Sequence, residues 1–81
     1  MAKLIVIPSK DFIKFLMFLG FDIVRIRGSH HRLRHDDGRV TTIPVHKNED
    51  LSKGLLRKII REDLQMELGE FNDVFKKWQN D

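Results

Sequence analysis

The chain contains no cysteine, and this absence removes three possibilities at once. Without thiols the protein has no disulfide bonds, no thiolate metal site and no cysteine nucleophile. Its 81 residues are also too few for two domains that each bury a core. We therefore expect one small domain over residues 1–81 that is stabilised by side-chain packing alone.

Long apolar runs are absent as well. Although 41% of the residues are apolar, no run approaches the roughly 20 residues that cross a bilayer. A charged fraction of 33% beside this apolar content is typical of a folded chain rather than of a disordered one. Residues 1–8 carry a single charge and no small-residue cleavage site, so they do not resemble a signal peptide. We expect a cytoplasmic protein with no membrane partner.

Positive charge is concentrated in one part of the chain. The net charge is +3 overall, but residues 25–47 hold six basic residues against two acidic ones, a net charge of +4. The same part holds all four histidines, His30, His31, His35 and His46. A localised basic surface favours a polyanionic partner. An ordinary solvated strand face would give the same pattern.

The first predicted element is a helix from about Lys10. We expect the Ser9 hydroxyl to accept a hydrogen bond from its first turn and Gly20 to form a left-handed C-terminal cap. Its apolar stripe consists of Phe12, Phe15, Leu16 and Leu19. Further apolar residues, Ile13, Met17 and Phe18, lie outside this stripe. The helix is therefore either covered on two sides or partly exposed for a protein partner.

After Gly20 the period becomes two, which predicts three strands. Gly28-Ser29 and Asp37-Gly38 have the residue types of tight turns, so the strands should form an antiparallel meander. Leu33 marks the buried side of the second strand, and His31 and His35 share its face. His30, Arg32 and Arg34 should therefore point the other way, unless the register slips by one residue. In the first strand the same period places Phe21, Ile23, Arg25 and Arg27 on one side.

Helical spacing returns after Pro44. Ser52 is the expected N-cap of a second helix, whose apolar stripe is Leu55, Leu56, Ile59, Ile60 and Leu64. Its polar side carries Lys53, Arg57, Lys58 and Arg61. A C-terminal helical extension over residues 65–81 should contain a third short helix or ordered tail from Glu70 to Trp78. We expect Trp78 to anchor this extension rather than to stack on nucleic-acid bases.

Several of these segments together resemble the HicA toxins, also called YcfA-like proteins, of bacterial and archaeal toxin-antitoxin pairs. Their order and spacing over roughly residues 8–64 carry the resemblance. The segments are Ser9-Lys10-Asp11 after a proline, Gly20-Phe21, Gly28-Ser29-His30-His31, Asp37-Gly38, Ile43-Pro44-Val45-His46 and the stretch 54–61. Two features depart from the family pattern: Leu55 stands where threonine is common, and Arg61-Glu62-Asp63-Leu64 replaces the usual Gln-Ala-Gly helix exit.

The resemblance implies both a fold and a function. The implied fold is α+β of the double-stranded-RNA-binding type, with the order α-β-β-β-α and two helices on one face of a three-stranded antiparallel sheet. The implied function is that of an mRNA interferase, an endoribonuclease that slows growth until a HicB-like antitoxin covers its active face. The family's catalytic histidine maps to His30.

The chemistry of RNA cleavage suits a histidine in a basic surface. RNA carries its own nucleophile, the ribose 2′-hydroxyl, and a base that removes its proton starts the reaction. We expect His30 to be this base and the product to end in a 2′,3′-cyclic phosphate, with no metal or other cofactor. His46 either protonates the leaving 5′-oxygen or fixes its loop by a backbone hydrogen bond. The expected RNA contacts are Arg25, Arg27, Ser29, Arg32, Arg34, Lys47, Lys53 and Arg57, of which Arg27, Arg32 and Lys47 should stabilise the charge on phosphorus.

Two other functions fit the same residues. A basic domain of this fold can hold duplex RNA without cutting it. A purely protein-binding subunit would instead bind an acidic partner and show no salt-dependent affinity for RNA. A metal site is not expected, because the adjacent His30 and His31 should point to opposite faces of their strand.

Overall fold

The computed structural model describes residues 5–80. Its elements are α1 (Ser9–Phe18), β1 (Phe21–Arg27), β2 (His30–His35), β3 (Val40–Pro44), α2 (Lys53–Lys58), the π-helical segment η1 (Ile59–Asp63) that continues α2, and α3 (Leu68–Gln79). The strands form one antiparallel sheet in the order β1-β2-β3. The expected α+β fold with the order α-β-β-β-α is confirmed, and a C-terminal helix follows it. Within residues 5–80, no helix combines the length and apolar character that a membrane span requires.

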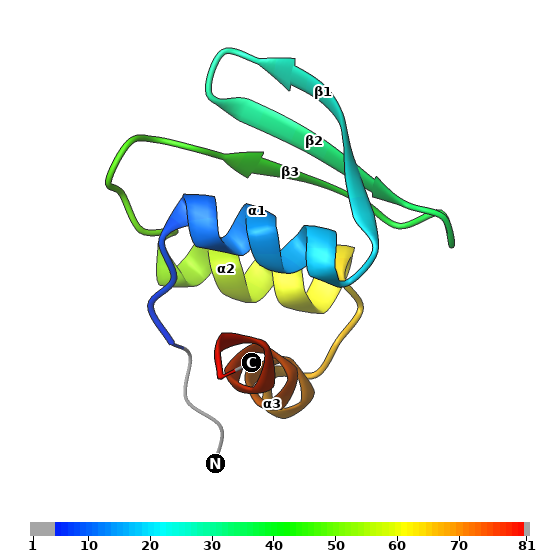
Figure 1. Ribbon diagram of the computed structural model, residues 1–81, viewed down its shortest axis with the longest axis vertical. Helices are drawn as coiled ribbons and strands as arrows, with labels where there is room; N and C mark the ends of the chain where they lie inside the picture. Colours follow the sequence, from blue (N-terminus) through cyan, green and yellow to red (C-terminus); the bar gives the residue numbers. More distant parts are fainter. Residues whose placement is uncertain (1–4, 81) are drawn as a thin grey trace.

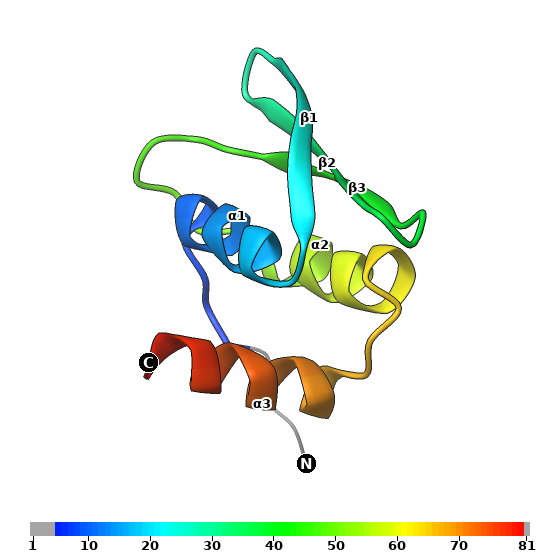
Figure 2. The same cartoon turned by 45° about the vertical axis from the view of Figure 1, so that its right-hand side comes forward.

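The elements are stacked in three layers. Helices α1 and α2 lie side by side on one face of the sheet, and α3 lies on the far side of these helices (Figures 1 and 2). No element of the described chain covers the other face of the sheet, which we call the open face. The tip of the β1–β2 hairpin projects away from the helix layer, so the helices cover the sheet unevenly.

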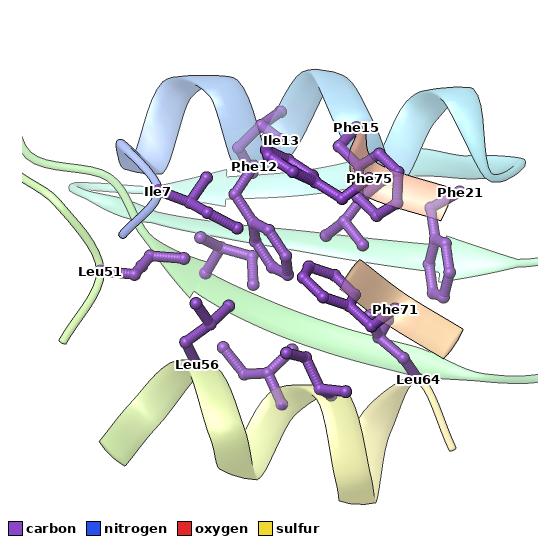
Figure 3. Close-up of a cluster of buried hydrophobic side chains, with 14 of the residues drawn as sticks. Ile7, Phe12, Ile13, Phe15, Phe21, Leu51, Leu56, Leu64, Phe71 and Phe75 are labelled. Carbon is purple, nitrogen blue, oxygen red and sulfur yellow. The ribbon is translucent and has the colours of Figure 1, made fainter. Parts of the chain in front are cut away.

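The core fills the space between the sheet and the three helices (Figure 3). Phe12 and Phe15 of α1 meet Phe71 and Phe75 of α3, and the ring centroids of three of these pairs lie 5.0, 5.4 and 6.0 Å apart. Aromatic pairs at such separations attract beyond the effect of their buried area. The other buried apolar side chains are Ile7, Ile13, Leu16, Phe21, Leu33, Ile43, Leu51, Leu56, Ile59, Ile60 and Leu64. α3 therefore shares a core with the elements that precede it.

Helix α1 is covered on two sides, by the sheet and by α3. Ile13 is buried, whereas Met17 and Phe18 remain 51% and 55% exposed. The expected cover on two sides is confirmed, and a protein partner on the exposed part stays a prediction. The ring of Trp78 in α3 lies 5.5 Å from that of Phe15 and 6.4 Å from that of Phe18. The prediction that Trp78 is a packing anchor is confirmed.

The predicted N-cap of α1 is wrong. The helix begins at Ser9 itself, and its capping position is Pro8, which makes no side-chain cap hydrogen bond. Ser9 is 2% exposed, and its Oγ lies 3.4 Å from the carbonyl oxygen of His46 and 3.3 Å from that of Glu49. A buried hydroxyl requires an acceptor, and these two carbonyls supply it from the loop after β3. Ser9 thus fastens the start of α1 to that loop.

The second helix begins as predicted and ends differently. Ser52 is the N-cap, and its side chain accepts a hydrogen bond of 3.3 Å from the amide of Leu55. From Ile59 the helix widens into the π-helical segment, in which the amide of Leu64 donates to the carbonyl of Ile59 at 2.9 Å. Asp63 at its end accepts a 2.8 Å hydrogen bond from the Thr41 hydroxyl of β3. This bond ties the helix exit to the sheet.

Gly20 forms a left-handed cap at the end of α1, as predicted, and its position also leaves no room for a side chain. Its φ is +105°, and a Cβ on Gly20 would stand 2.8 Å from Nε2 of His35. The ring of His35 is itself held by a 3.1 Å hydrogen bond between Nε2 and the Leu19 carbonyl. We expect Gly20→Ala to lower the free energy of unfolding by about 2 kcal/mol or more, measured by denaturant titration.

Substitutions at two other glycines distinguish backbone strain from steric clash as the cause of that loss. Gly28 has a φ of +57° but open space around it, so Gly28→Ala should cost only the backbone strain, about 1 kcal/mol. Gly54 lies in α2, where an added Cβ would meet no atom of another part of the protein within 4 Å, and Gly54→Ala should stabilise the protein by up to about 1 kcal/mol. Equal losses at Gly20 and Gly28 would contradict the role given to the His35 ring.

Candidate nucleic-acid interface

Strand β2 alternates strictly between the two faces of the sheet. Leu33 is fully buried, and its neighbours on the same face, His31 and His35, are partly buried. The intervening side chains are exposed on the open face: His30, Arg32 and Arg34. The predicted orientation of this strand is confirmed.

Strand β1 changes face in its middle. Ile23 pairs with Leu33 on the helix-covered side, whereas Arg25 pairs with Arg32 on the open face, and the register shifts between them. Directly paired residues share a face, so the extra residue Val24 forms a β-bulge that reverses the alternation. The prediction that Phe21, Ile23, Arg25 and Arg27 share one side is therefore wrong. The bulge is what brings the two arginines of β1 onto the open face.

His30 stands at the end of the open face where the strands meet the hairpin turn. Its pairing partners are Arg27 on β1 and Pro44 on β3. Side chains in such directly opposed positions have Cβ atoms about 4.5–5.5 Å apart. Arg32 follows two residues further along β2 and faces the same way. The imidazole is thus exposed to solvent and flanked by guanidinium groups from two strands.

The arginines of the open face make no ion pair within the described chain, although Asp22 of β1 stands opposite Arg34 of β2. Over residues 5–80 the close contacts between basic nitrogens and carboxylates join Asp37 to the His35 ring and to Arg39, and Arg61 to Glu62. None of them includes Arg25, Arg27, Arg32 or Arg34. Arg25 and Arg32 are even directly opposed, an arrangement that destabilises a sheet through like-charge repulsion. Such a face is suited to an anionic ligand that supplies the missing negative charge.

The hairpin turn next to His30 is held in place by β3. Gly28 has positive φ and Ser29 does not, which matches a type II′ turn, and the predicted Gly28-Ser29 turn is confirmed. The carbonyl of Ser29 accepts a 2.7 Å hydrogen bond from the amide of Val45. Ser29 therefore contributes its backbone to the site by fixing Pro44 and Val45 beside the turn.

Pro44, and not His46, is the residue directly across from His30. His46 lies beyond the end of β3, where it lines a hollow of about 220 Å³ together with Ser9, Pro44, Glu49, Asp50, Leu51, Ser52 and Leu55. Its carbonyl is one of the acceptors near the Ser9 hydroxyl, at 3.4 Å. Lys47 follows as an exposed residue of the same loop.

The remaining predicted RNA contacts lie in another layer. Lys53 and Arg57 are exposed residues of α2, and α2 lies on the sheet face opposite the open face (Figures 1 and 2). The structure thus places Arg27 and Arg32 next to His30, with Arg25 and Arg34 further along the same face, and leaves the basic residues of α2 on a separate surface.

His35 has a structural role, as its predicted side of the sheet implied. Its Nδ1 accepts a 3.0 Å hydrogen bond from the Asp37 amide, which leaves the proton on Nε2 for donation to the Leu19 carbonyl at 3.1 Å. Its ring also lies edge-on to Phe21, with centroids 5.1 Å apart. His31 faces the same way, between Ile26 and Ile43, and its buried Nδ1 has no hydrogen-bond partner within residues 5–80.

Arg39 belongs to the basic part of the sequence but not to the open face. Its Nη1 donates a 2.7 Å hydrogen bond to the Leu64 carbonyl, and its Nε lies 2.8 Å from Oδ2 of Asp37. The guanidinium carbon stands 5.3 Å from the centre of the Phe21 ring. Arg39 therefore joins the β2–β3 turn to the end of η1, a role that charge counting along the sequence did not reveal.

Comparison with known proteins adds the decisive observation. The family model of the HicA toxin of bacterial toxin-antitoxin pairs matches residues 9–64, from the start of α1 to the end of the second helix. The chain belongs to the HicA toxin family. Neither the comparison with curated proteins nor that with solved structures gave a match. Membership of a toxin-antitoxin family implies an antitoxin partner, and α3 lies outside the part that the HicA family shares.

The titratable side chains that the structure describes in this HicA-family toxin do not gather into a cluster of metal ligands. Within residues 5–80, no group of three or more His, Asp or Glu side chains is arranged to hold a metal ion. His30 and His31 in particular face opposite sides of the sheet.

Asp37 makes the turn of the sheet sensitive to acid. The backbone amide of Arg39, which donates to Asp37 at 3.0 Å, is the largest cause that holds the pKa of this carboxyl below its usual 3.8. The side-chain hydrogen bond and charge of Arg39 and the charge of His35 act in the same direction. Because the folded state lowers this pKa, Asp37 stabilises the fold above the pKa of the unfolded chain. This stabilisation is lost as the pH falls through the lower, folded value.

We therefore expect Asp37→Asn to be less stable than the wild type at neutral pH, with a difference that shrinks from about pH 5 toward pH 2. Urea titrations of both proteins across this range measure it. Asp36→Asn is the matched control, because it removes the same charge from the adjacent residue without removing these hydrogen bonds. A difference that stays constant with pH would contradict the assigned cause.

Proposed function

We propose that this HicA-family toxin is a metal-independent endoribonuclease that cleaves mRNA and uses His30 as its general base. The observation that carries the proposal is the position of His30, which is exposed on the open face and paired with Arg27. An exposed imidazole can exchange protons with a substrate, and the adjacent guanidinium groups can bind the phosphate that reacts.

The reaction begins when Nε2 or Nδ1 of His30 takes the proton of a ribose 2′-hydroxyl. The O2′–P bond then forms while the P–O5′ bond breaks, and the departing 5′-oxygen gains a proton. The products are a 2′,3′-cyclic phosphate and a 5′-hydroxyl end. Arg27 and Arg32, which lie on the same face as His30, stabilise the negative charge that builds up on the phosphoryl oxygens.

The proton for the 5′-oxygen comes from His46 or from water. Pro44 occupies the position opposite His30, so His46 would act from the loop after β3. An acid at this position gives a bell-shaped pH profile of cleavage, because the base must be neutral while the acid is protonated. His46→Ala would then lose the decline on the alkaline side, whereas a proton from water would leave the profile unchanged.

The RNA strand lies across the open face in this proposal. The arginines of β1 and β2 offer contacts to phosphate, and no Phe, Tyr or Trp side chain of β1, β2 or β3 faces the same way to stack on bases. Binding should therefore depend strongly on salt and weakly on sequence. A HicB-like antitoxin would inhibit the toxin by covering this face.

Removing the imidazole of His30 should slow cleavage strongly and leave RNA binding largely intact. We expect His30→Ala to reduce the rate of cleavage of a single-stranded RNA by about 10²–10⁴-fold, with the RNA affinity changed far less. Cleavage by the wild type should continue in excess chelator, yield cyclic-phosphate ends, and fail on a substrate with 2′-deoxyribose at the scissile position.

His31→Ala is the matched control, since it changes the adjacent histidine on the helix-covered face and should leave the chemical step intact. Circular dichroism of both variants verifies that they are folded. Equal cleavage by His30→Ala and the wild type would exclude His30 as the base. RNA binding by the wild type without any cleavage would instead identify a non-catalytic RNA-binding module of this fold.

The salt dependence of binding should distinguish the open face from α2. Each phosphate contact with single-stranded RNA contributes about 0.7 to the slope of log K against log salt concentration. Arg32→Gln should therefore reduce this slope by about 0.7, whereas Arg57→Gln, on the surface of α2, should reduce it less. Equal reductions would extend the interface over α2 and contradict its restriction to the sheet.

A further inference from the structure

Strand β1 has one edge without a partner in the described chain. It is the outer strand of the order β1-β2-β3, so β2 pairs with only one of its edges. Every residue of β1 after Phe21 is exposed, from Asp22 to Arg27. The unpaired edge therefore presents its backbone amides and carbonyls to solvent, which is a template for the addition of another strand.

The same strand exposes an unusual share of apolar surface. Ile23, Val24 and Ile26 are 37%, 54% and 59% exposed, and they make up three of the seven large apolar side chains that are exposed in residues 5–80. Ile26 pairs with His31 on the helix-covered side of the sheet and is nevertheless exposed. The tip of the β1–β2 hairpin rises above the helices (Figure 2). Clustered exposed apolar side chains at a free strand edge are typical of a protein-binding surface.

Because of the bulge at Val24, the basic and the apolar side chains of β1 lie on opposite faces of the sheet. Beyond the bulge, Arg25 and Arg27 point to the open face, and Ile26 points to the other side. A strand laid along this edge would meet guanidinium groups on one of its faces and apolar side chains on the other. Its own side chains would pair with both groups if acidic and apolar residues alternated along it.

A second copy of this chain does not fit the edge. Two copies of β1 paired antiparallel about a two-fold axis would keep their faces aligned, so the arginines of one copy would oppose those of the other. Like charges in opposed positions destabilise a sheet. Within each copy, Arg25 already opposes Arg32. Charge complementarity instead selects an acidic partner.

From these observations we infer that the free edge of β1 is a docking site for an extended segment of a partner protein in which acidic and apolar residues alternate. The segment adds a fourth strand next to β1. Its acidic side chains pair with Arg25 and Arg27, and its apolar side chains cover Ile23 and Ile26. This inference concerns the edge of the sheet and does not depend on RNA cleavage.

A capped seven-residue peptide of alternating Glu and Val tests the inference on the full chain labelled with ¹⁵N. We expect the largest amide shift changes within Ile23–Arg27, and affinity at least about tenfold lower for the same peptide with Lys in place of Glu. A strand uses one edge for pairing, so N-methylation of one alternate set of its residues should abolish binding and N-methylation of the other set should not.

Side-chain variants provide the matched comparison. Ile26→Thr should weaken peptide binding about threefold or more by removing apolar contact, with RNA cleavage unchanged. Val6→Thr is the control, because Val6 is 58% exposed outside β1 and its change should leave both properties unaffected.

Several outcomes would overturn the inference. Among these are the absence of peptide binding, shift changes centred on β3 or α2, and equal binding of the Glu and Lys peptides. Self-association of the free chain that Ile26→Thr abolishes would assign the edge to a second copy instead. Loss of RNA cleavage in His30→Ala with peptide binding intact would show that the two sites are independent.

Discussion

Leu33, at the centre of β2, is fully buried between the sheet and the helices, and its position determines which face every other side chain of the strand occupies. A strand has a side-chain period of two, so a shift of one residue would turn His30 and its neighbouring arginines toward the core. Burying two guanidinium groups and an imidazole there would cost far more than the contacts of one leucine return. The hydrophobic core and the basic surface thus select the same register.

A set of hydrogen bonds between distant segments then fixes the sheet on the helices. Ser9 joins the start of α1 to the loop after β3, Thr41 joins β3 to Asp63, and the Ser29 carbonyl joins the hairpin turn to Val45. His35 and Arg39 perform the same task at the opposite end of the sheet. Because these bonds lie at the strand ends or on the helix-covered side of the sheet, the middle of the open face is left free of structural contacts.

The features that could be predicted from the sequence are those that depend on side-chain alternation and on the residue types of short segments. The alternation in β2 followed from Leu33 alone, and the Gly28-Ser29 turn and the Ser52 cap followed from residue types. Long-range effects caused the errors. Ser9 has the residue type of a cap, but its burial gives its hydroxyl other acceptors. Nothing in the local sequence marks Val24 as a bulge, since the residues around it are all compatible with regular alternation.

The repulsion between the opposed Arg25 and Arg32 destabilises the free protein. Bound or dissolved anions can reduce this repulsion without a change in the fold. Dissolved ions that screen this repulsion stabilise the fold, while the same ions compete with a nucleic acid for the surface. Ionic strength therefore acts with opposite signs on folding and on polyanion binding. A bound polyanion in turn acts as a counterion that is specific to the folded sheet, and its occupancy raises the melting temperature.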